Sequence, residues 1–316
     1  AAQGIRWVAT RFVARLGAAS NTVREILSTS ASGECTLGRR MTDHVRTMPH
    51  GSPFEEVSDL SDRPAGYSVI GEVLRVQDSM EPQNILHQIF GFRPVHPHAK
   101  SWFSGAIGER KVGDLLLQLG PEWAVLHSVP VGKGDSDIDH VVIGPAGVFT
   151  INTKRHPGKN IWVGERMIMV AGQKTDHLRN SRHEAKRAAK LLTQATGIPV
   201  DAHPVLAIVE PASFTFRQRP ADVSIMDARR LPRWLKRRRA VLDPDTLARV
   251  IHAALESRTW HATADLSIDP ASIERFVELQ RKDNRAYLVR LAWSLGISIA
   301  AGGAAILLLT SLTTGL

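Results

Sequence analysis

Three polar residues lie at the open end of an otherwise apolar hairpin, in the stretch SDIDHVVIGPAGVFTINTKRHPGK of residues 136–159. If the Pro-Ala pair forms the centre of a tight turn, Asp139 lies directly opposite Asn152, with Cβ atoms about 4.5–5.5 Å apart. Lys154 is two positions further along and shares the face of Asn152. A bulge at Gly147 would move the register by one residue and remove this opposition. The hydrophobic pattern is compatible with both registers.

An acid, a second oxygen ligand and a lysine on adjacent strands suit metal-assisted hydrolysis of a phosphodiester. Mg²⁺ binds oxygen ligands and keeps several waters, and it lowers the pKa of a bound water. Lys154 would add positive charge beside the nucleophile or the scissile phosphate. The alternative is a surface hairpin whose polar ends are solvated, and the spacing alone leaves both interpretations open.

The elements that must position this hairpin follow from hydrophobic periodicity. Apolar residues recur every three or four positions over residues 105–120, which predicts an amphipathic helix that Gly120 ends. Runs rich in β-branched residues predict strands, and residues 158–164 are predicted to be a turn region. The strands are expected at 123–129, 138–143, 148–152, 167–170, 205–209 and 223–226. Further helices are expected at 176–196, 231–239 and 244–256, the last capped by Asp243.

The C-terminal end differs in kind from the rest of the chain. Residues 291–312 carry no charge, and their length suits a helix that crosses a bilayer. Trp293 lies where an interfacial aromatic residue is expected, and four cations precede the span. These cations are Arg281, Lys282, Arg285 and Arg290. The positive-inside rule therefore predicts a single-pass protein of the cell membrane with its main domain in the cytoplasm.

The chain is predicted to divide into four parts. Residues 1–98 contain many Ser, Pro, Gly and His residues and little periodicity, so we expect a mostly irregular or disordered leader. Residues 100–260 form the main domain, 261–287 a helical juxtamembrane linker, and 288–312 the transmembrane helix.

The net charge of +9 indicates a polyanionic partner, either nucleic acid or an anionic membrane surface. Two basic clusters are candidate nucleic-acid contacts, and a solvated basic surface is the alternative for both. They comprise Arg179, Arg182, Lys186 and Arg187 in the helix at 176–196, and Arg237 and Arg238 in the run RRLPRWLKRRR. The single cysteine, Cys35, excludes a disulfide within this chain and a cysteine-cluster metal site. The stretch VGKGDSD lacks the spacing of a P-loop.

Three segments together resemble a known family. GAIGERKVGDLL, SDIDHVVIGPAGVFTINTKRHPG and HPVLAIV resemble the NERD (nuclease-related) domain, which is similar to the PD-(D/E)XK restriction-endonuclease-like superfamily. The resemblance covers about residues 105–235. It implies a central mixed sheet flanked by helices, and DNA cleavage that depends on Mg²⁺ or Mn²⁺. By motif position it implies that Glu109 is the glutamate of the first helix, Asp139 the metal-binding aspartate and Lys154 the motif lysine.

Asn152 departs from this motif, which has Asp or Glu at its position. Its side-chain oxygen can still bind a metal, but it is neutral, so divalent metal binding should weaken. Glu109 would compensate if its helix delivers it to the same point, which makes Asp139, Asn152 and Glu109 the candidate ligands. Asp135 and Asp137 are second choices in the neighbouring loop.

Two functions of different classes follow. The first is a membrane-anchored nuclease that acts on DNA, with RNA as the other candidate substrate. The second is a catalytically inactive module that retains the nuclease fold and binds nucleic acid or membrane. Asn152 motivates the second, because a lost carboxylate is what a decayed metal site would show.

Overall fold

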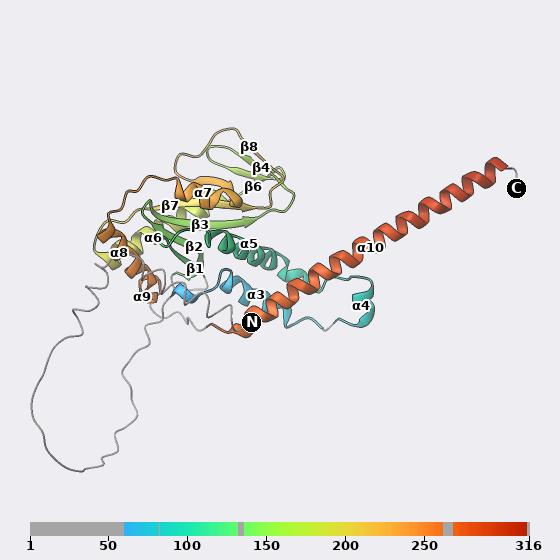
Figure 1. The fold of residues 1–316 in the computed structure, drawn as a ribbon, viewed down its shortest axis with the longest axis horizontal. Helices are drawn as coiled ribbons and strands as arrows, with labels where there is room; N and C mark the ends of the chain where they lie inside the picture. Colours follow the sequence, from blue (N-terminus) through green and yellow to red (C-terminus); the bar gives the residue numbers. More distant parts are fainter. Residues whose placement is uncertain (1–59, 82, 132–135, 262–267, 315–316) are drawn as a thin grey trace, which may run out of the picture.

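The computed structural model describes residues 60–81, 83–131, 136–261 and 268–314. Two mixed sheets lie among helices, and one long helix extends away from them (Figure 1). This arrangement confirms the predicted mixed α/β fold with flanking helices and a long apolar C-terminal helix.

The larger sheet has five strands in the order β1-β2-β3-β7-β9. Its strands are β1 (Ala124–Pro130), β2 (Asp137–Gly144), β3 (Gly147–Arg155), β7 (Ala202–Val209) and β9 (Ser224–Asp227). The first three pair antiparallel, whereas β3, β7 and β9 pair parallel. Parallel neighbours require a long crossover connection, and the chain between β3 and β7 supplies it.

The β2–β3 hairpin has the register of a two-residue turn. Gly144 pairs with Gly147, and His140 pairs with Ile151. The bulged alternative is therefore excluded. Gly144 must be a glycine, because a Cβ there would lie 2.3 Å from the indole of Trp123.

Helices cover both faces of this sheet. On one face α5 (Lys100–Leu116) and α7 (Leu231–Lys236) pack against a core that includes Phe149 and Ile151. On the other face α6 (His177–Thr196), α8 (Pro244–Leu255) and α9 (Ser257–Trp260) pack against a core that includes Val141. Asp243 caps α8 as predicted, because its carboxylate accepts hydrogen bonds from the backbone N–H groups of Asp245 and Thr246. The sheet that carries Asp139, Asn152 and Lys154 is therefore buried on both faces.

A second sheet was not predicted as such. It has the order β6-β5-β4-β8 and consists of β4 (Asn160–Val163), β5 (Ile168–Val170), β6 (Gln173–Thr175) and β8 (Ser213–Phe216). The expectation of a turn over residues 158–164 was wrong, because β4 occupies most of it. Its strands are short, and β4 pairs in parallel with β8, about fifty residues away. Local patterns do not report such pairing.

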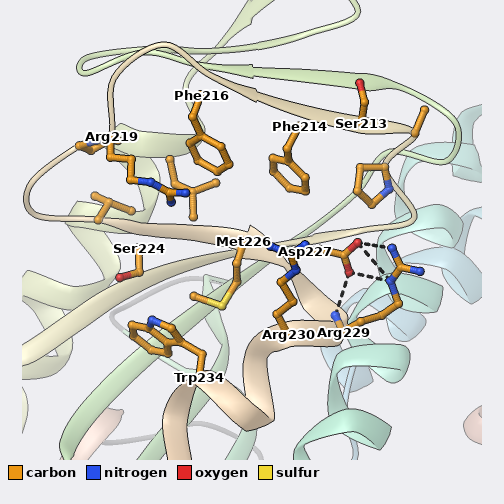
Figure 2. A pocket seen from close by; sticks show the side chains of 15 residues that line it. Ser213, Phe214, Phe216, Arg219, Ser224, Met226, Asp227, Arg229, Arg230 and Trp234 are labelled. Carbon is orange, nitrogen blue, oxygen red and sulfur yellow. Dashed lines mark hydrogen bonds and ion pairs between the residues drawn. The ribbon is translucent and has the colours of Figure 1, made fainter. Parts of the chain in front are cut away.

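A groove of about 600 Å³ runs between the free edges of the two sheets. Figure 2 shows Phe214 and Phe216 pointing into it from β8, with Met226 and Trp234 on the side of β9 and α7. Asp227 and Arg229 form an ion pair at its border, with 2.5 Å between the closest atoms. None of the candidate catalytic residues lines this groove.

The segment before the main domain is more regular than expected. Residues 1–59 of the predicted leader lie outside the described residues, but 60–98 contain η1 (Leu60–Asp62), α3 (Tyr67–Gln77), α4 (Ile85–Ile89) and η2 (Pro97–Ala99). The irregular reading was therefore wrong for 60–98. Ile70 and Val73 of α3 pack with Phe103 of α5 and Phe276 in one buried cluster. Tertiary burial therefore stabilises α3, whereas α4 has no buried residue.

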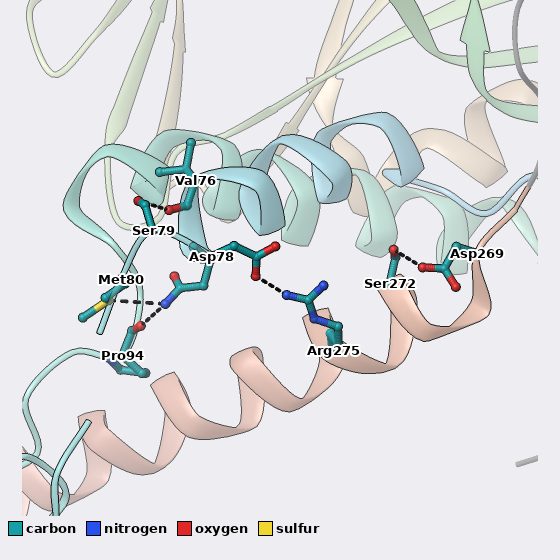
Figure 3. Close-up of polar contacts among 9 residues, drawn as sticks. Val76, Asp78, Ser79, Met80, Pro94, Asp269, Ser272 and Arg275 are labelled. Carbon is teal, nitrogen blue, oxygen red and sulfur yellow. Dashed lines mark hydrogen bonds and ion pairs between the residues drawn. The ribbon is translucent and has the colours of Figure 1, made fainter. Parts of the chain in front are cut away.

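The helix α10 (Pro270–Thr314) unites the predicted linker and the predicted span in one element of 45 residues. Its first turns are bound to the domain: Phe276 is fully buried, and Arg275 forms an ion pair with Asp78 (Figure 3). Further along, α10 contains an 18-residue window with a mean hydropathy of 1.5, none of it buried. It is the one helix in the described part of the chain that is long and apolar enough to cross a membrane.

Candidate active site

The two strands of the hairpin separate where the polar residues begin. Regular pairing of β2 with β3 ends at His140 and Ile151. The next inward N–H group of β3, that of Thr153, donates to the carboxylate of Asp139 at 2.6 Å. Asp139 therefore takes the place of a ladder partner and holds its carboxylate between the strand ends, where it is 9% exposed.

Asn152 is fully buried beside Asp139, and its amide donates to the carboxylate of Glu184 on α6. The sequence interpretation did not select Glu184. The structure thus places an acid from a helix next to the position where the motif expects an acid on the strand. A signal for this residue existed, because Glu184 lies at helical spacing from the buried Ser181 and Ala188.

Glu109 comes to the same region from α5 and is 4% exposed. Glycine precedes it because α5 packs tightly on β3: a Cβ on Gly108 would lie 3.0 Å from the Cβ of Arg155. Asp137, the first residue of β2, is half-buried beside Asp139. Asp135 lies outside the described residues.

All four carboxyl groups of this cluster have a raised pKa, and burial is the largest cause for each. Burial, with the charge of Asp139, raises the pKa of Glu184 to about 8 and that of Asp137 to about 6. Burial, with the charges of Asp139 and Asp137, holds the pKa of Glu109 well above its usual range. Burial also raises the pKa of Asp139, against the charge of Lys154 and the Thr153 N–H bond. Without a bound cation, the raised pKa therefore favours the protonated form of Glu184 at pH 7.

Lys154 is the positive charge at the centre of this cluster. Its charge lowers the pKa values of Glu109, Asp139 and Glu184. Beside it, the rings of His156 and His177 stack with 3.1 Å between their Nε2 atoms. Burial and the charge of Lys154 lower the pKa values of both rings, that of His177 to about 4. Both imidazoles are therefore neutral at pH 7.

The side-chain oxygens of the cluster suit a hard cation. Oxygen atoms on Glu109, Asp137, Asn152 and Glu184 are buried without a hydrogen-bond partner. Such atoms are costly unless something satisfies them. Within the described ranges, no three His, Cys, Asp or Glu side chains converge as a ready-made metal site. Mg²⁺ needs only one or two carboxylates plus waters, so the oxygen donors present fit it.

The basic residues of α6 divide between two environments. Arg179 and Arg187 line a groove of about 290 Å³ together with Asp137, His183 and Glu184. These two cations therefore flank the carboxylate cluster.

The other predicted cations of α6 are not placed in this way. Arg182 forms a two-bond ion pair with Asp222, at 2.6 and 2.9 Å, and Lys186 is exposed.

The second basic cluster does not join the site. The chain just after Arg237 and Arg238 returns to the hairpin turn, where the Val241 N–H donates to the Pro145 carbonyl at 2.8 Å. The turn is at the opposite end of the hairpin from Asp139, about 20 Å away at the rise of a strand. Arg238 lies over the ring of Trp234 at 5.0 Å.

Comparison with known proteins agrees with this geometry. Residues 104–209 match the model of the NERD family, the nuclease-related domain. An uncharacterized protein of Bacillus anthracis is 41% identical over 68 residues, which cover 20% of this chain and 32% of that relative. The chain thus spans about a third of that relative's length. No solved structure matches the chain significantly. The matched segment contains the hairpin, Glu109 and Glu184, so the residues of the candidate site lie in the part of the chain that is similar to a nuclease-related domain.

Proposed function

We propose that this chain is a membrane-anchored nuclease that hydrolyses phosphodiester bonds of DNA with the help of Mg²⁺ or Mn²⁺. The observation that carries the proposal is the cluster of buried carboxylates, with unpartnered oxygens, around Lys154 in a nuclease-related domain. Perturbed acids that gather around one lysine are typical of catalytic sites.

Glu184 on α6 would supply the carboxylate that the motif lacks at Asn152. Asp139 and Glu184 would be the two charged ligands, and the free side-chain oxygen of Asn152 a neutral third. Asn152 also orients Glu184 through its amide. Glu109, on α5, would bind a water held by the metal or act as a further oxygen ligand.

When bound, Mg²⁺ supplies a water of lowered pKa and stabilises charge that develops on the phosphate. Lys154 orients the attacked phosphate or the nucleophile and adds a positive charge there. The neutral His156–His177 pair is available to accept a proton beside it. Burial excludes bulk water from the carboxylates, so each charge acts strongly.

Nucleic acid would approach over the N-terminal half of α6. Arg179 and Arg187 lie on the wall of the groove that also contains Asp137 and Glu184, so a phosphate backbone held there passes the carboxylates. Contacts of arginines with backbone phosphates carry no sequence information, and we therefore propose binding without sequence preference.

The membrane would hold the domain through α10. Four cations, at residues 281, 282, 285 and 290, precede the uncharged stretch, and the positive-inside rule supports a cytoplasmic position for the domain in this proposal. DNA cleavage would then occur close to the inner membrane surface.

The second candidate is an inactive module that binds nucleic acid. The neutral Asn152 favours it, since a metal site with fewer charges binds divalent cations more weakly. The two candidates differ in whether the purified chain binds Mg²⁺ and cleaves.

The test uses the full chain in detergent micelles with supercoiled plasmid, single-stranded DNA and RNA as substrates. We expect cleavage of DNA with Mg²⁺ or Mn²⁺, none with EDTA, and a loss of at least about 100-fold in Asp139→Asn, Glu184→Gln and Lys154→Met. Glu165→Gln, at an exposed turn position, is the matched control and should cleave normally. Isothermal calorimetry should show Mn²⁺ binding that Asp139→Asn weakens. DNA binding without metal binding or cleavage would establish the inactive module instead.

A further inference from the structure

A short loop beside the C-terminal helix exposes an unusual run of apolar side chains. Five large apolar residues of α4 and the segment after it are at least half exposed. They are Ile85 (74%), Leu86 (61%), Ile89 (50%), Phe90 (51%) and Phe92 (56%). No other part of the described chain outside α10 gathers so many, and a soluble surface normally avoids such a patch.

The loop has a built conformation. Asn84 caps α4 by accepting from the His87 N–H at 2.9 Å. The Gln83 side chain donates to the Phe92 carbonyl at 3.0 Å, and that of Gln77 donates to the Pro94 carbonyl at 2.9 Å. The apolar side chains are therefore displayed by a structured loop.

The loop is also bound to α10 where the uncharged stretch begins. Trp293 donates its indole N–H to the Ile89 carbonyl at 2.8 Å, and its ring lies 5.7 Å from that of Phe90. Arg290 donates to the carbonyl of Gly91. Gly91 has a φ of +68°, and a Cβ there would lie 2.6 Å from a backbone oxygen of α10, so only glycine allows this approach. Figure 1 shows α4 beside α10, away from the sheets.

We propose that residues 85–92, hereafter the α4 loop, insert into the headgroup region of the same leaflet that α10 enters. The inference rests on the proposed membrane anchor and adds a second point of contact to it. Trp293 is at the level where an aromatic residue meets the bilayer interface, and the α4 loop touches Trp293. Exposed Ile, Leu and Phe side chains at that level are those that interfacial segments bury in lipid.

The charges around the loop fit a lipid surface as its partner. Arg285 precedes the apolar contacts of α10 by about one turn, Arg290 lies at the border of the patch, and Arg93 at the end of the loop is ion-paired with Asp283 at 3.6 Å. Cations above an apolar face match anionic headgroups above acyl chains. Because α10 is packed in the domain core at Phe276 and continues into the span, α10 and the α4 loop together hold the domain at one orientation on the membrane.

The test places a fluorescent label at single cysteines in the full chain with Cys35→Ser. The labelled positions are Leu86→Cys in the loop, Ile299→Cys in the span and Leu117→Cys at the far end of α5. Leu117 is 64% exposed, so it matches Leu86 in exposure and residue type. The protein is reconstituted in vesicles of phosphatidylcholine and phosphatidylglycerol that contain spin-labelled lipid.

We expect the label at Leu86 to shift to the blue and to lose fluorescence to spin labels near the headgroup. The label at Ile299 should be quenched by spin labels in the middle of the acyl chains, and that at Leu117 by neither. Ile85→Cys provides a second loop position with the same expectation.

Three outcomes would overturn the inference, and they are distinguishable. A loop label that behaves like Leu117, while Ile299 is quenched, leaves the anchor intact and removes the loop contact. A blue shift at Leu86 without quenching by lipid shows that protein, such as a second copy of the chain, covers the loop. An unquenched Ile299 removes the anchor itself, and the loop contact with it.

Discussion

Replacing Glu184 by glutamine tests the carboxylate cluster through stability as well as activity. Burial and the charge of Asp139 raise the pKa of Glu184 from its ordinary 4.5 to about 8. An acid with a raised pKa in the folded state stabilises the fold fully only below its unfolded pKa. That contribution is lost as the pH rises through the folded pKa. The metal-free protein should therefore become less stable from about pH 5 to about pH 8 because of this residue.

The magnitude follows from the shift in pKa. Each tenfold preference for the protonated form is worth about 1.4 kcal/mol, so at pH 7 the folded state bears an unfavourable term of about 3 kcal/mol from Glu184. Between about pH 6 and pH 9 this term grows by about 2–3 kcal/mol. Glu184→Gln keeps the shape of the side chain and an acceptor for the Asn152 amide, but does not ionise. Its advantage in the free energy of unfolding over the native protein should grow with pH by that amount.

Mg²⁺ should offset most of this difference at pH 7. A cation that binds the folded state at 100 times its Kd adds about 2.7 kcal/mol. The native protein should gain this stability, whereas Glu184→Gln should gain little and lose cleavage.

The assay is thermal unfolding of the full chain in detergent micelles across this pH range, with EDTA and with Mg²⁺. Glu165→Gln is the control that removes one exposed carboxylate, and its stability should run parallel to that of the native protein. If the Glu184→Gln and native curves are parallel in EDTA, and Mg²⁺ stabilises both equally, Glu184 neither has a raised pKa nor binds Mg²⁺.

Three further predictions concern Asn152, the buried pair of His127 and His140, and Phe276. Asn152→Asp should not increase cleavage and should destabilise the metal-free protein by about 1–3 kcal/mol, because it replaces a donor by a charge facing Glu184. The exchange Asn152→Glu with Glu184→Asn should recover part of the activity, and an increase in Asn152→Asp alone would contradict the assignment. His127 and His140, with 2.8 Å between their Nδ1 atoms, have pKa values lowered to about 3 by burial, so stability should fall as the pH drops from about 6.5 towards 3. His140→Gln should reduce that slope by about 1.4 kcal/mol per pH unit in chemical denaturation, and an unchanged slope would show that the rings are not buried neutral. Phe276→Ala should destabilise the domain by about 3–5 kcal/mol, because its ring is fully buried between α3, α5 and α10; a change under about 1 kcal/mol would show that α10 is not packed on the core.

The hairpin illustrates how far local patterns reach. Its two apolar runs and the Pro-Ala turn predicted a hairpin, but the hydrophobic pattern was compatible with a two-residue turn and with a bulge at Gly147. The structure has the two-residue turn, which pairs Gly144 with Gly147 and places Asp139 beside Asn152. The apolar helix at the C-terminal end was predictable, because its composition alone distinguishes it.

The contact between Glu184 and Asn152 could not be predicted from local patterns. Glu184 is about thirty residues from Asn152, and its helical spacing from Ser181 and Ala188 indicates the buried side of α6 but not which residue of the sheet it meets. Only the packing of α6 on the sheet brings its carboxylate to the Asn152 amide. The α4 loop is a similar case, because its apolar residues seem unremarkable until α10 passes beside them.

Periodicity and composition predicted α5, α6, the hairpin strands β2 and β3, strand β7 and the apolar stretch of α10. These features depend on periodicity and composition within a short window. The tertiary structure alone decided the register of the hairpin, which acid faces Asn152, how β4 and β8 form a second sheet, and which loop lies beside α10. The physical reason is that burial and mutual charge depend on contacts between residues far apart in the chain, whose side chains have no local pattern to reveal them.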